Sequence, residues 1–209
     1  MKVLMLNGSP HENGCTATAL TEVASALRQE GVDSEIVWLG KSPIRDCTAC
    51  GACQKLDSQC VFSDDLVNEV CQKAREADGF IFGTPVYYAH PSGAVLSFLD
   101  RLFYAADAEV FARKPGAAVA SARRAGTTAS LDVLNKYFTI AQMPIVSSQY
   151  WNMVHGNTPE QVRQDLEGLQ IMRTLGKNMA WLLKCIEAGK KAGILPPEDE
   201  PRQRTNFIR

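Results

Sequence analysis

The sequence predicts a three-layer α/β fold, in which a five-stranded, doubly wound parallel sheet carries helices on both faces. Two observations predict this fold. Short apolar runs alternate with helical patterns along the chain, and the central run, residues 79–83 (GFIFG), contains no polar residue. An apolar run of this kind is typical of a strand buried on both faces of a parallel sheet. Strands that alternate with helices are joined by right-handed crossovers, which give this architecture.

The first half of the chain supplies three predicted strands. Residues 2–6 form an apolar run that leads into a helix with apolar side chains at helical spacing, and Gly31 closes this helix. Residues 34–39 form the second strand, and a long loop then runs to about Ser63. Ser63 or Asp64 is predicted to cap a second helix, which precedes the central strand.

The second half continues the alternation. A helix through residues 98–103 follows the loop 84–93, and Asp100 and Arg101 within it are expected to form a structural ion pair. Residues 117–122 form the fourth strand. A helix through residues 131–138 then leads to a weak fifth strand at 145–148.

The last helix has a strong start signal. Thr158 is suited to cap it, Pro159 occupies the first helical position, and Gln161 lies three residues after the cap. Apolar positions at helical spacing continue to residue 186. Gly168 and Gly176 are expected to kink or split this helix.

The bulk composition limits the classes of function. The 209 residues suffice for one domain, placed at 1–189, and the proline-containing residues 190–209 are interpreted as a C-terminal arm available to a partner subunit. The formal net charge of −1 gives no basic surplus for nucleic acid or an anionic membrane. No apolar run reaches the roughly 18 residues of a membrane span, and residues 1–9 lack signal-peptide features. We therefore expect a cytoplasmic protein.

The predicted topology indicates where a ligand binds. A doubly wound sheet binds ligands at the carboxyl ends of its strands, where the strand order reverses. In the flavodoxin-like order 2-1-3-4-5, the reversal lies between strands 1 and 3. The loops that follow these strands, residues 7–16 and 84–93, are therefore the first candidates for a site.

The loop 7–16 (NGSPHENGCT) has the composition of a phosphate-binding loop. It joins a buried strand to a helix N-terminus, where free N–H groups and the helix dipole favour an anion. A Walker A loop needs Gly-Lys-Ser/Thr, but here Gly14 is followed by Cys15 and Thr16. The dinucleotide-binding pattern GxGxxG is absent. A low-molecular-weight phosphatase needs a cysteine at the start of a loop that ends in arginine, whereas Cys15 begins a helix. Two interpretations of the loop stay open: a site for the phosphate of FMN, and a capped structural turn that binds nothing. The predicted phosphate contacts are Ser9, His11, Asn13, Gly14, Cys15 and Thr16.

Two further loops offer contacts to a flavin ring. After the central strand, backbone N–H groups face the polar edge of the ring, and two tyrosines offer flat apolar faces. After the fourth strand, an arginine supplies a cation for the reduced flavin or for nicotinamide phosphates. The alternatives are tyrosines that pack at the sheet edge and ordinary surface arginines. The predicted contacts are Pro85, Val86, Tyr87, Tyr88, Ser121, Arg123, Arg124 and Gly126.

Five motifs carry a family resemblance: NGSPHENGCT, CTACGACQKLDSQC, GFIFGTPVYYAHPSG, FLDR and DLEGLQIMRTLGKNMAWLLK. In their order and spacing they resemble the NADPH-dependent FMN reductase superfamily and, within it, the iron–sulfur flavoprotein branch, from residue 1 to about residue 186. The resemblance implies a flavodoxin-like fold, FMN bound across the subunit interface, and a homodimer or homotetramer. It implies flavin contacts at Ser9, Asn13, Thr16, Pro85, Val86, Tyr87, Arg123 and Gly126.

The cysteines form a second candidate site. Seven is an odd number, and the expected compartment is reducing, so a disulfide framework is disfavoured. Cys47, Cys50, Cys53 and Cys60 have the compact spacing of thiolates around a [4Fe–4S] cluster. The resemblance implies an electron route from FMN through such a cluster to a one-electron acceptor. Zinc, which usually takes two CxxC units with a longer spacer, and a metal-free loop are the alternatives.

Three functions are consistent with these motifs. The first is an FMN-dependent NAD(P)H oxidoreductase that passes hydride to the flavin and electrons on to a quinone, a nitro compound, free flavin or the cluster. The second is an electron carrier that acts with protein partners, and the third is a redox sensor that works through the four clustered cysteines. Flavin chemistry needs positioning and electrostatics, so no catalytic side chain is predicted. The physiological acceptor and the choice between NADH and NADPH stay open.

Overall fold

A computed structural model describes residues 1–201, 203, 205 and 207 and confirms the doubly wound α/β fold. The parallel strands follow the order β2-β1-β3-β5-β6, which corresponds to the predicted order 2-1-3-4-5. A short additional strand, β4, pairs antiparallel with the end of β3. The strands are β1 (Lys2–Asn7), β2 (Asp33–Trp38), β3 (Gly79–Tyr87), β4 (His90–Pro91), β5 (Gly116–Ala122) and β6 (Met153–His155).

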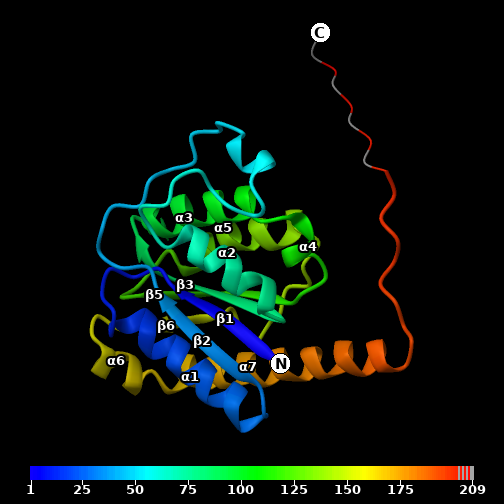
Figure 1. Cartoon of the computed structure of the whole chain (residues 1–209). Helices are drawn as coiled ribbons and strands as arrows, with labels where there is room; N and C mark the ends of the chain where they lie inside the picture. Colours follow the sequence, from blue (N-terminus) through cyan, green and yellow to red (C-terminus); the bar gives the residue numbers. More distant parts are fainter. Residues whose placement is uncertain (202, 204, 206, 208–209) are drawn as a thin grey trace.

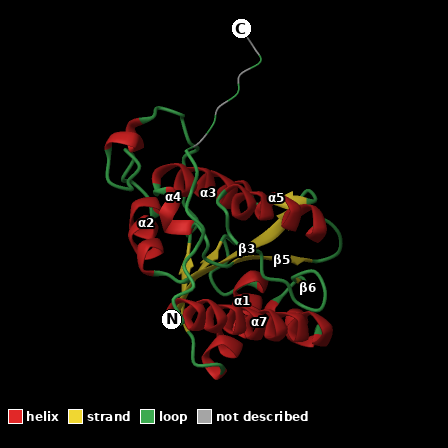
Figure 2. Ribbon diagram, turned by 90° about the vertical axis from the view of Figure 1, so that its right-hand side faces the viewer, coloured by secondary structure: helices red, strands yellow, loops and turns green. Residues whose placement is uncertain are grey.

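The helices form two layers, one on each face of the sheet (Figures 1 and 2). One layer contains α2 (Val67–Glu76), α3 (Gly93–Ala105), α4 (Ala108–Phe111) and α5 (Thr127–Ile140). The other contains α1 (Cys15–Gln29), α6 (Pro159–Gln164) and α7 (Leu166–Lys191). A 3₁₀ turn, η1 (Ala52–Lys55), lies in the long loop that carries the clustered cysteines.

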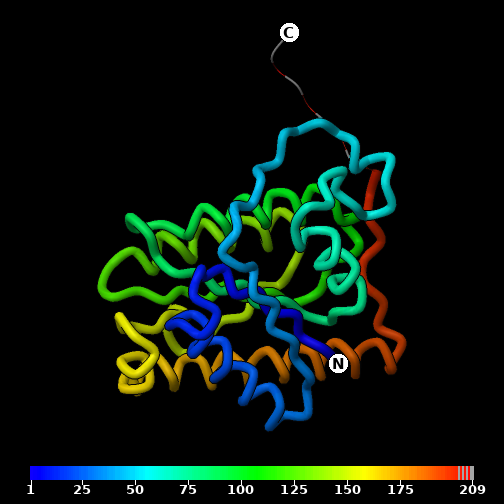
Figure 3. Tube along the Cα trace, turned by 60° about the vertical axis from the view of Figure 1, so that its left-hand side comes forward, coloured from blue at the N-terminus to red at the C-terminus, as the bar shows by residue number. Residues whose placement is uncertain are grey.

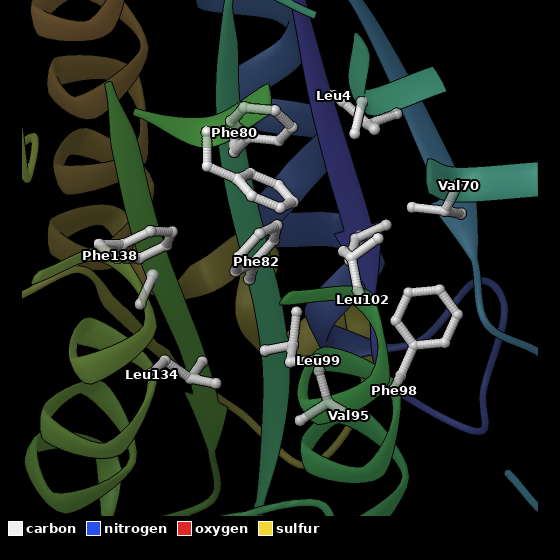
Figure 4. Packing of buried hydrophobic residues seen from close by; sticks show 14 of the residues in the cluster. Leu4, Val70, Phe80, Phe82, Val95, Phe98, Leu99, Leu102, Leu134 and Phe138 are labelled. Carbon is white, nitrogen blue, oxygen red and sulfur yellow. The ribbon is translucent and has the colours of Figure 1, made fainter. Parts of the chain in front are cut away.

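The apolar strands are explained by burial on both faces. Side chains alternate along a strand, so Leu4 faces the layer of α2, α3 and α5, whereas Met5 faces the layer of α1 and α7. Phe80 and Phe82 pack in the first of these two cores, as Figure 4 shows. The ring centroids of Phe82 and Phe138 lie 5.1 Å apart, which joins the central strand to α5. The central strand is therefore fixed from both sides.

The fifth strand differs from the prediction. Residue 145 forms only an isolated bridge to Gly116, and the strand proper is Met153–His155, which pairs with the end of β5. The amide of Gly116 donates to Pro144 O, and the amide of Val146 donates to Gly116 O. The chain then leaves the sheet and rejoins it, so the predicted strand 145–148 was wrong. The chain pairs with β5 in two separate places, and the residue pattern of one short segment cannot reveal this.

Two predictions about the helices differ from the structure. The helix predicted from Thr158 is split at Asp165, whose side chain accepts from the Gly168 amide at 2.9 Å, and not at the two glycines. Thr158 itself caps α6 as predicted. The helix α2 has Leu66 at its N-cap position and, among the described residues, no side-chain cap, so the predicted cap at Ser63 or Asp64 was wrong. Asp65 accepts from the Val67 amide at 3.1 Å just before the helix. A carboxylate cap competes successfully with the glycines because it satisfies free N–H groups.

The C-terminal segment leaves the body after α7 and runs up one side of it (Figure 1). Its contacts include Arg113, whose Nη2 donates to Pro197 O at 3.0 Å and pairs with Asp199 at 2.6 Å. The division into a domain 1–189 and an arm 190–209 stays a prediction, and part of that arm (202, 204, 206, 208 and 209) lies outside the described residues. Within the described part of the chain, no helix combines the length and the apolar character of a membrane span.

Candidate cofactor sites

The loops at the carboxyl edge of the sheet are joined by side-chain hydrogen bonds. The hydroxyls of Thr16 and Ser121 share a hydrogen bond of 2.7 Å, which links the loop after β1 to the end of β5. Ser92, which caps α3, donates from Oγ to Gly8 O at 3.0 Å. The structure therefore brings together the loops that the predicted topology singled out. Their relative positions are fixed by buried polar contacts.

The start of α1 has the properties of an anion site. No side chain of the described residues caps the helix, and Gly14 at the N-cap position adopts an extended conformation. Within the described residues, the amides of Cys15, Thr16 and Ala17 have no acceptor. A capped structural turn would have satisfied some of these groups, so that alternative does not describe this helix start. Free amides at a helix N-terminus favour a phosphate.

The side chains of this loop divide into buried and exposed groups. Ser9 and Thr16 are buried, and the Ser9 hydroxyl accepts from the His11 amide at 3.1 Å. His11 and Asn13 are exposed, whereas Gly14 and Cys15 are half-buried. The Cys15 thiol lies 3.6 Å from the carbonyl oxygen of the residue after β6, and burial raises its pKa. Cys15 is therefore a neutral packing group at neutral pH and adds no charge to the loop.

Asn7 and Trp38 hold the loop between β1 and α1, and neither residue was among the predicted site residues. The side chain of Asn7 accepts from the Ser9 amide at 3.1 Å and donates to Glu12 O at 3.0 Å. The indole N–H of Trp38 donates to Ser9 O at 2.8 Å. An asparagine at the end of a buried strand is a signal that could have found Asn7. Nothing in the sequence alone links Trp38 to this loop.

The predicted loop after the central strand is a hairpin. β3 continues to Tyr87, and Val86 and Tyr87 pair with Pro91 and His90 of β4. The two residues of the turn, Tyr88 and Ala89, have φ angles of 50° and 65°, a region that side chains other than glycine rarely adopt. Tyr88 is 99% exposed at the tip. The hairpin therefore projects a strained aromatic residue from the edge of the sheet.

The loop after β5 packs against this hairpin. Gly126 has a φ of 96°, and a Cβ atom there would lie 2.5 Å from the Cα of Ala89. Gly126 therefore permits the close approach of the two predicted flavin loops. Arg123 and Arg124 are exposed, and the ring Nε2 of His155 lies 3.0 Å from Arg124 O. The structure places all the predicted ring contacts, Pro85 to Tyr88, Ser121, Arg123, Arg124 and Gly126, at this one edge.

The four clustered cysteines line a single pocket. Cys47, Cys50, Cys53 and Cys60 share it with the side chain of Arg101. None of the seven cysteines forms a disulfide. Among the described residues, no three histidine, cysteine, aspartate or glutamate side chains are gathered closely enough to hold a metal ion. The four thiols thus line one pocket, but among the described residues they are not arranged as ligands around one metal ion.

The thiol of Cys53 lies close enough to the other three to be affected by them. Burial raises the pKa of Cys53, and the nearby Cys50, Cys60 and Cys47 add to that rise. The amide of residue 52 and the hydroxyl of residue 48 lower the pKa of Cys50. Four cysteine thiols in one loop are the donor set of a [4Fe–4S] cluster. The residues present therefore fit such a cluster in number and chemistry.

The pairing of Arg101 corrects an expectation from the sequence. Adjacent residues Asp100 and Arg101 suggested an ion pair, but Asp100 accepts from the Tyr137 hydroxyl. Arg101 instead pairs with Asp65 and donates from Nε to the Cys60 sulfur at 3.4 Å. Neighbours in sequence point to different sides of a helix, so i and i+1 side chains do not face each other.

The two candidate sites lie at opposite ends of α3. Ser92 caps the helix beside the phosphate loop, whereas Arg101 and Tyr104, in the last two turns of the helix, line the cysteine pocket. The loop that carries the cysteines is the long excursion above the upper helices in Figure 3. The helix α3 therefore connects the carboxyl edge of the sheet to the cysteine pocket.

Comparisons with known proteins agree with this arrangement. A sequence model of NADPH-dependent FMN reductase matches residues 1–158. An iron–sulfur flavoprotein of Methanocaldococcus jannaschii is 30% identical over 90% of this chain and 100% of its own length. An iron–sulfur flavoprotein of Methanosarcina thermophila is 25% identical over 91% of this chain and 99% of its own.

Solved structures show the same fold at low identity. The crystal structure of RosB with a bound flavin intermediate has a TM-score of 0.69 and 15% identity, and the match covers 100% of this chain and 92% of RosB. An archaeal flavodoxin has a TM-score of 0.59 and 14% identity, over 88% of this chain and 99% of its own. The fold is thus flavodoxin-like. The chain belongs to the NADPH-dependent FMN reductase family, within which its relatives are iron–sulfur flavoproteins.

Proposed function

We propose that this protein is an FMN-dependent NAD(P)H oxidoreductase that passes electrons to a small acceptor or to an iron–sulfur cluster of its own. The observation that carries the proposal is the uncapped start of α1, whose free amides lie beside the buried hydroxyls of Ser9 and Thr16. The family membership supports the cofactor. The arrangement supplies neutral donors at a helix start, which is what a flavin phosphate requires.

The phosphate loop would bind FMN without a cationic side chain of its own. Thr16 and Ser9 would donate hydroxyl hydrogen bonds, and the amides of Cys15 and Ala17 would complete the cradle. Asn7 would keep the loop in shape through its two hydrogen bonds to the loop backbone. A preorganised cradle lowers the entropic cost of binding the phosphate.

The hairpin and the loop after β5 would bind the ring. Pro85 to Tyr88 would place backbone groups and aromatic faces beside the isoalloxazine, and Gly126 would keep the hairpin seated. Arg123 or Arg124 would stabilise negative charge on the reduced flavin or hold the nicotinamide phosphates. Bound FMN supplies hydride and one-electron chemistry. The protein's contribution is positioning, so the reaction needs no general base.

Cys47, Cys50, Cys53 and Cys60 would hold a [4Fe–4S] cluster, which accepts one electron at a time. The names of the relatives and the shared pocket of the four thiols support this assignment over zinc or a metal-free loop. We also infer a homodimer or homotetramer, in line with the resemblance.

The experiment that tests this function begins with anaerobic purification. The visible spectrum and the iron content are recorded, and NADH or NADPH oxidation is then followed with a quinone as acceptor. Flavin bands and steady turnover are expected, with about four iron atoms per chain if the cluster is complete. A colourless protein that does not take up FMN would overturn the proposal. Flavin bands with almost no turnover would instead favour the flavodoxin-like electron carrier.

A further inference from the structure

Arg101 is the only charged side chain in the buried class among the described residues. It is 1% exposed and lies on α3, in the last two turns of the helix. A buried guanidinium is costly unless it is paired and hydrogen-bonded. Its partners therefore indicate why the fold retains it.

In the described part of the chain, all the polar partners of Arg101 come from the cysteine loop and its flanks. Nη1 pairs with Asp65 and donates to Arg45 O at 3.3 Å, and Nη2 donates to Phe62 O at 3.2 Å. Nε donates to the Cys60 sulfur at 3.4 Å. The guanidinium thus joins the beginning and the end of the loop to α3. Cys60, the last of the four thiols, is held from inside the protein.

We propose that Arg101 positions Cys60 and raises the reduction potential of an iron–sulfur cluster in the cysteine pocket. The inference rests on the cluster in the proposed function. When such a cluster gains one electron, negative charge increases on the cluster and its thiolates. A hydrogen bond to a ligand sulfur and a nearby fixed positive charge both stabilise the reduced form. The effect is larger where water is excluded, as it is around this side chain.

Asp65 sets the size of this effect. Its carboxylate neutralises part of the guanidinium charge and fixes the orientation of the side chain. Removal of the Asp65 charge would leave more uncompensated positive charge beside Cys60. The arginine and the aspartate are therefore expected to shift the potential in opposite directions when each is neutralised.

Arg45 provides a matched control. The guanidinium carbon of Arg45 lies 4.6 Å from the centre of the Phe62 ring, and the guanidinium carbon of Arg101 lies 5.6 Å from the same point. Arg45 also pairs with an aspartate, Asp64, but it is exposed and donates to no sulfur. Both arginines lie near the Phe62 ring and pair with an aspartate. They differ in burial and in the contact with Cys60.

The test uses full-length protein reconstituted anaerobically with FMN, iron and sulfide, as wild type, Arg101→Gln, Asp65→Asn and Arg45→Gln. Iron content is measured first, and the cluster is then titrated electrochemically while its reduced form is followed by electron paramagnetic resonance. We expect Arg101→Gln to need a more negative potential and Asp65→Asn a less negative one, with Arg45→Gln near wild type. A tenfold change in the ratio of reduced to oxidised cluster corresponds to about 59 mV for one electron.

The possible results distinguish the proposed role of Arg101 from the presence of the cluster. Equal potentials for Arg101→Gln and Arg45→Gln would overturn the inference while leaving the cluster in place. If Arg101→Gln takes up too little iron to titrate, Asp65→Asn decides, because asparagine keeps the oxygen that accepts from the Val67 amide. No upward shift in that variant would also overturn the inference. A wild type that binds FMN but no iron would remove the cluster and this role together, and leave the flavin reductase intact.

Discussion

The hydroxyls of Thr16 and Ser121 share a buried hydrogen bond of 2.7 Å, although 105 residues separate them in the sequence. Thr16 lies in the first turn of α1, and Ser121 lies near the end of β5. The bond ties the proposed phosphate loop to the strand whose following loop would bind the ring. It gives the candidate site one rigid wall.

Thr16→Val is expected to weaken FMN binding by roughly tenfold, because it removes the proposed donor to the phosphate and the hydrogen bond to the Ser121 hydroxyl. The shape of the side chain is nearly unchanged, so packing is preserved. Fluorescence titration of the flavin-free protein measures the affinity. Riboflavin, which lacks the phosphate, serves as the second ligand.

In Thr16→Val, the affinity for riboflavin is expected to fall less than the affinity for FMN. Thr139→Val makes the same substitution at an exposed position of α5 and is expected to leave both affinities unchanged. Equal losses for both ligands would show that Thr16 does not act on the phosphate.

Gly126→Ala is expected to destabilise the protein more than Gly31→Ala. Both glycines have positive φ, which costs an alanine about 1 kcal/mol at either position. A Cβ atom at Gly31 meets nothing within 4 Å, whereas one at Gly126 meets the hairpin backbone. Urea unfolding measures the difference in the free energy of unfolding. Equal losses would mean that the contact between the hairpin and the loop after β5 is loose.

Tyr88→Asn is expected to raise the thermal stability and to weaken the binding of flavin or nicotinamide. Asparagine tolerates the positive φ of the turn better than tyrosine, so strain of about 1 kcal/mol is relieved. The exposed ring is lost at the same time. Calorimetry and ligand titration measure the two effects. Ala89→Gly, which relieves strain without removing an aromatic ring, should stabilise the protein and leave the affinities unchanged.

Glu35→Gln is expected to lower the stability at neutral pH by roughly 1 kcal/mol, since each exposed ion pair contributes about 0.2–1 kcal/mol. Lys2 and Lys73 contact Glu35 at 2.6 and 2.7 Å and lower the pKa of its carboxyl. A carboxylate with a lowered pKa stabilises the fold above its usual pKa, and the contribution is lost as the pH falls through the folded-state pKa. The difference from wild type should therefore vanish in acid.

Urea unfolding of both proteins between neutral and acidic pH checks this prediction. Glu76→Gln, at an exposed position at the end of α2, is the control. A difference that persists in acid would show that Glu35 stabilises the fold by packing and not by its charge.

The sequence by itself determined the layers and the strand order, and it singled out the edge of the sheet that carries the candidate site. Strand periodicity, the apolar central strand and the polar loop before a helix are local features, and the fold follows from them because parallel sheets need cover on both faces. The four cysteines were also evident from their spacing alone. In each case the signal lies within a short stretch of chain.

The tertiary structure decided what depends on contacts between distant segments. It joined Thr16 to Ser121, paired Arg101 with Asp65 and Cys60, and seated Gly126 against the hairpin. It also moved the fifth strand to Met153–His155, because that strand is defined by its pairing with β5 and not by its own composition. A hydrogen bond between residues far apart in sequence leaves no periodic trace, so these relationships appear only once the chain is folded.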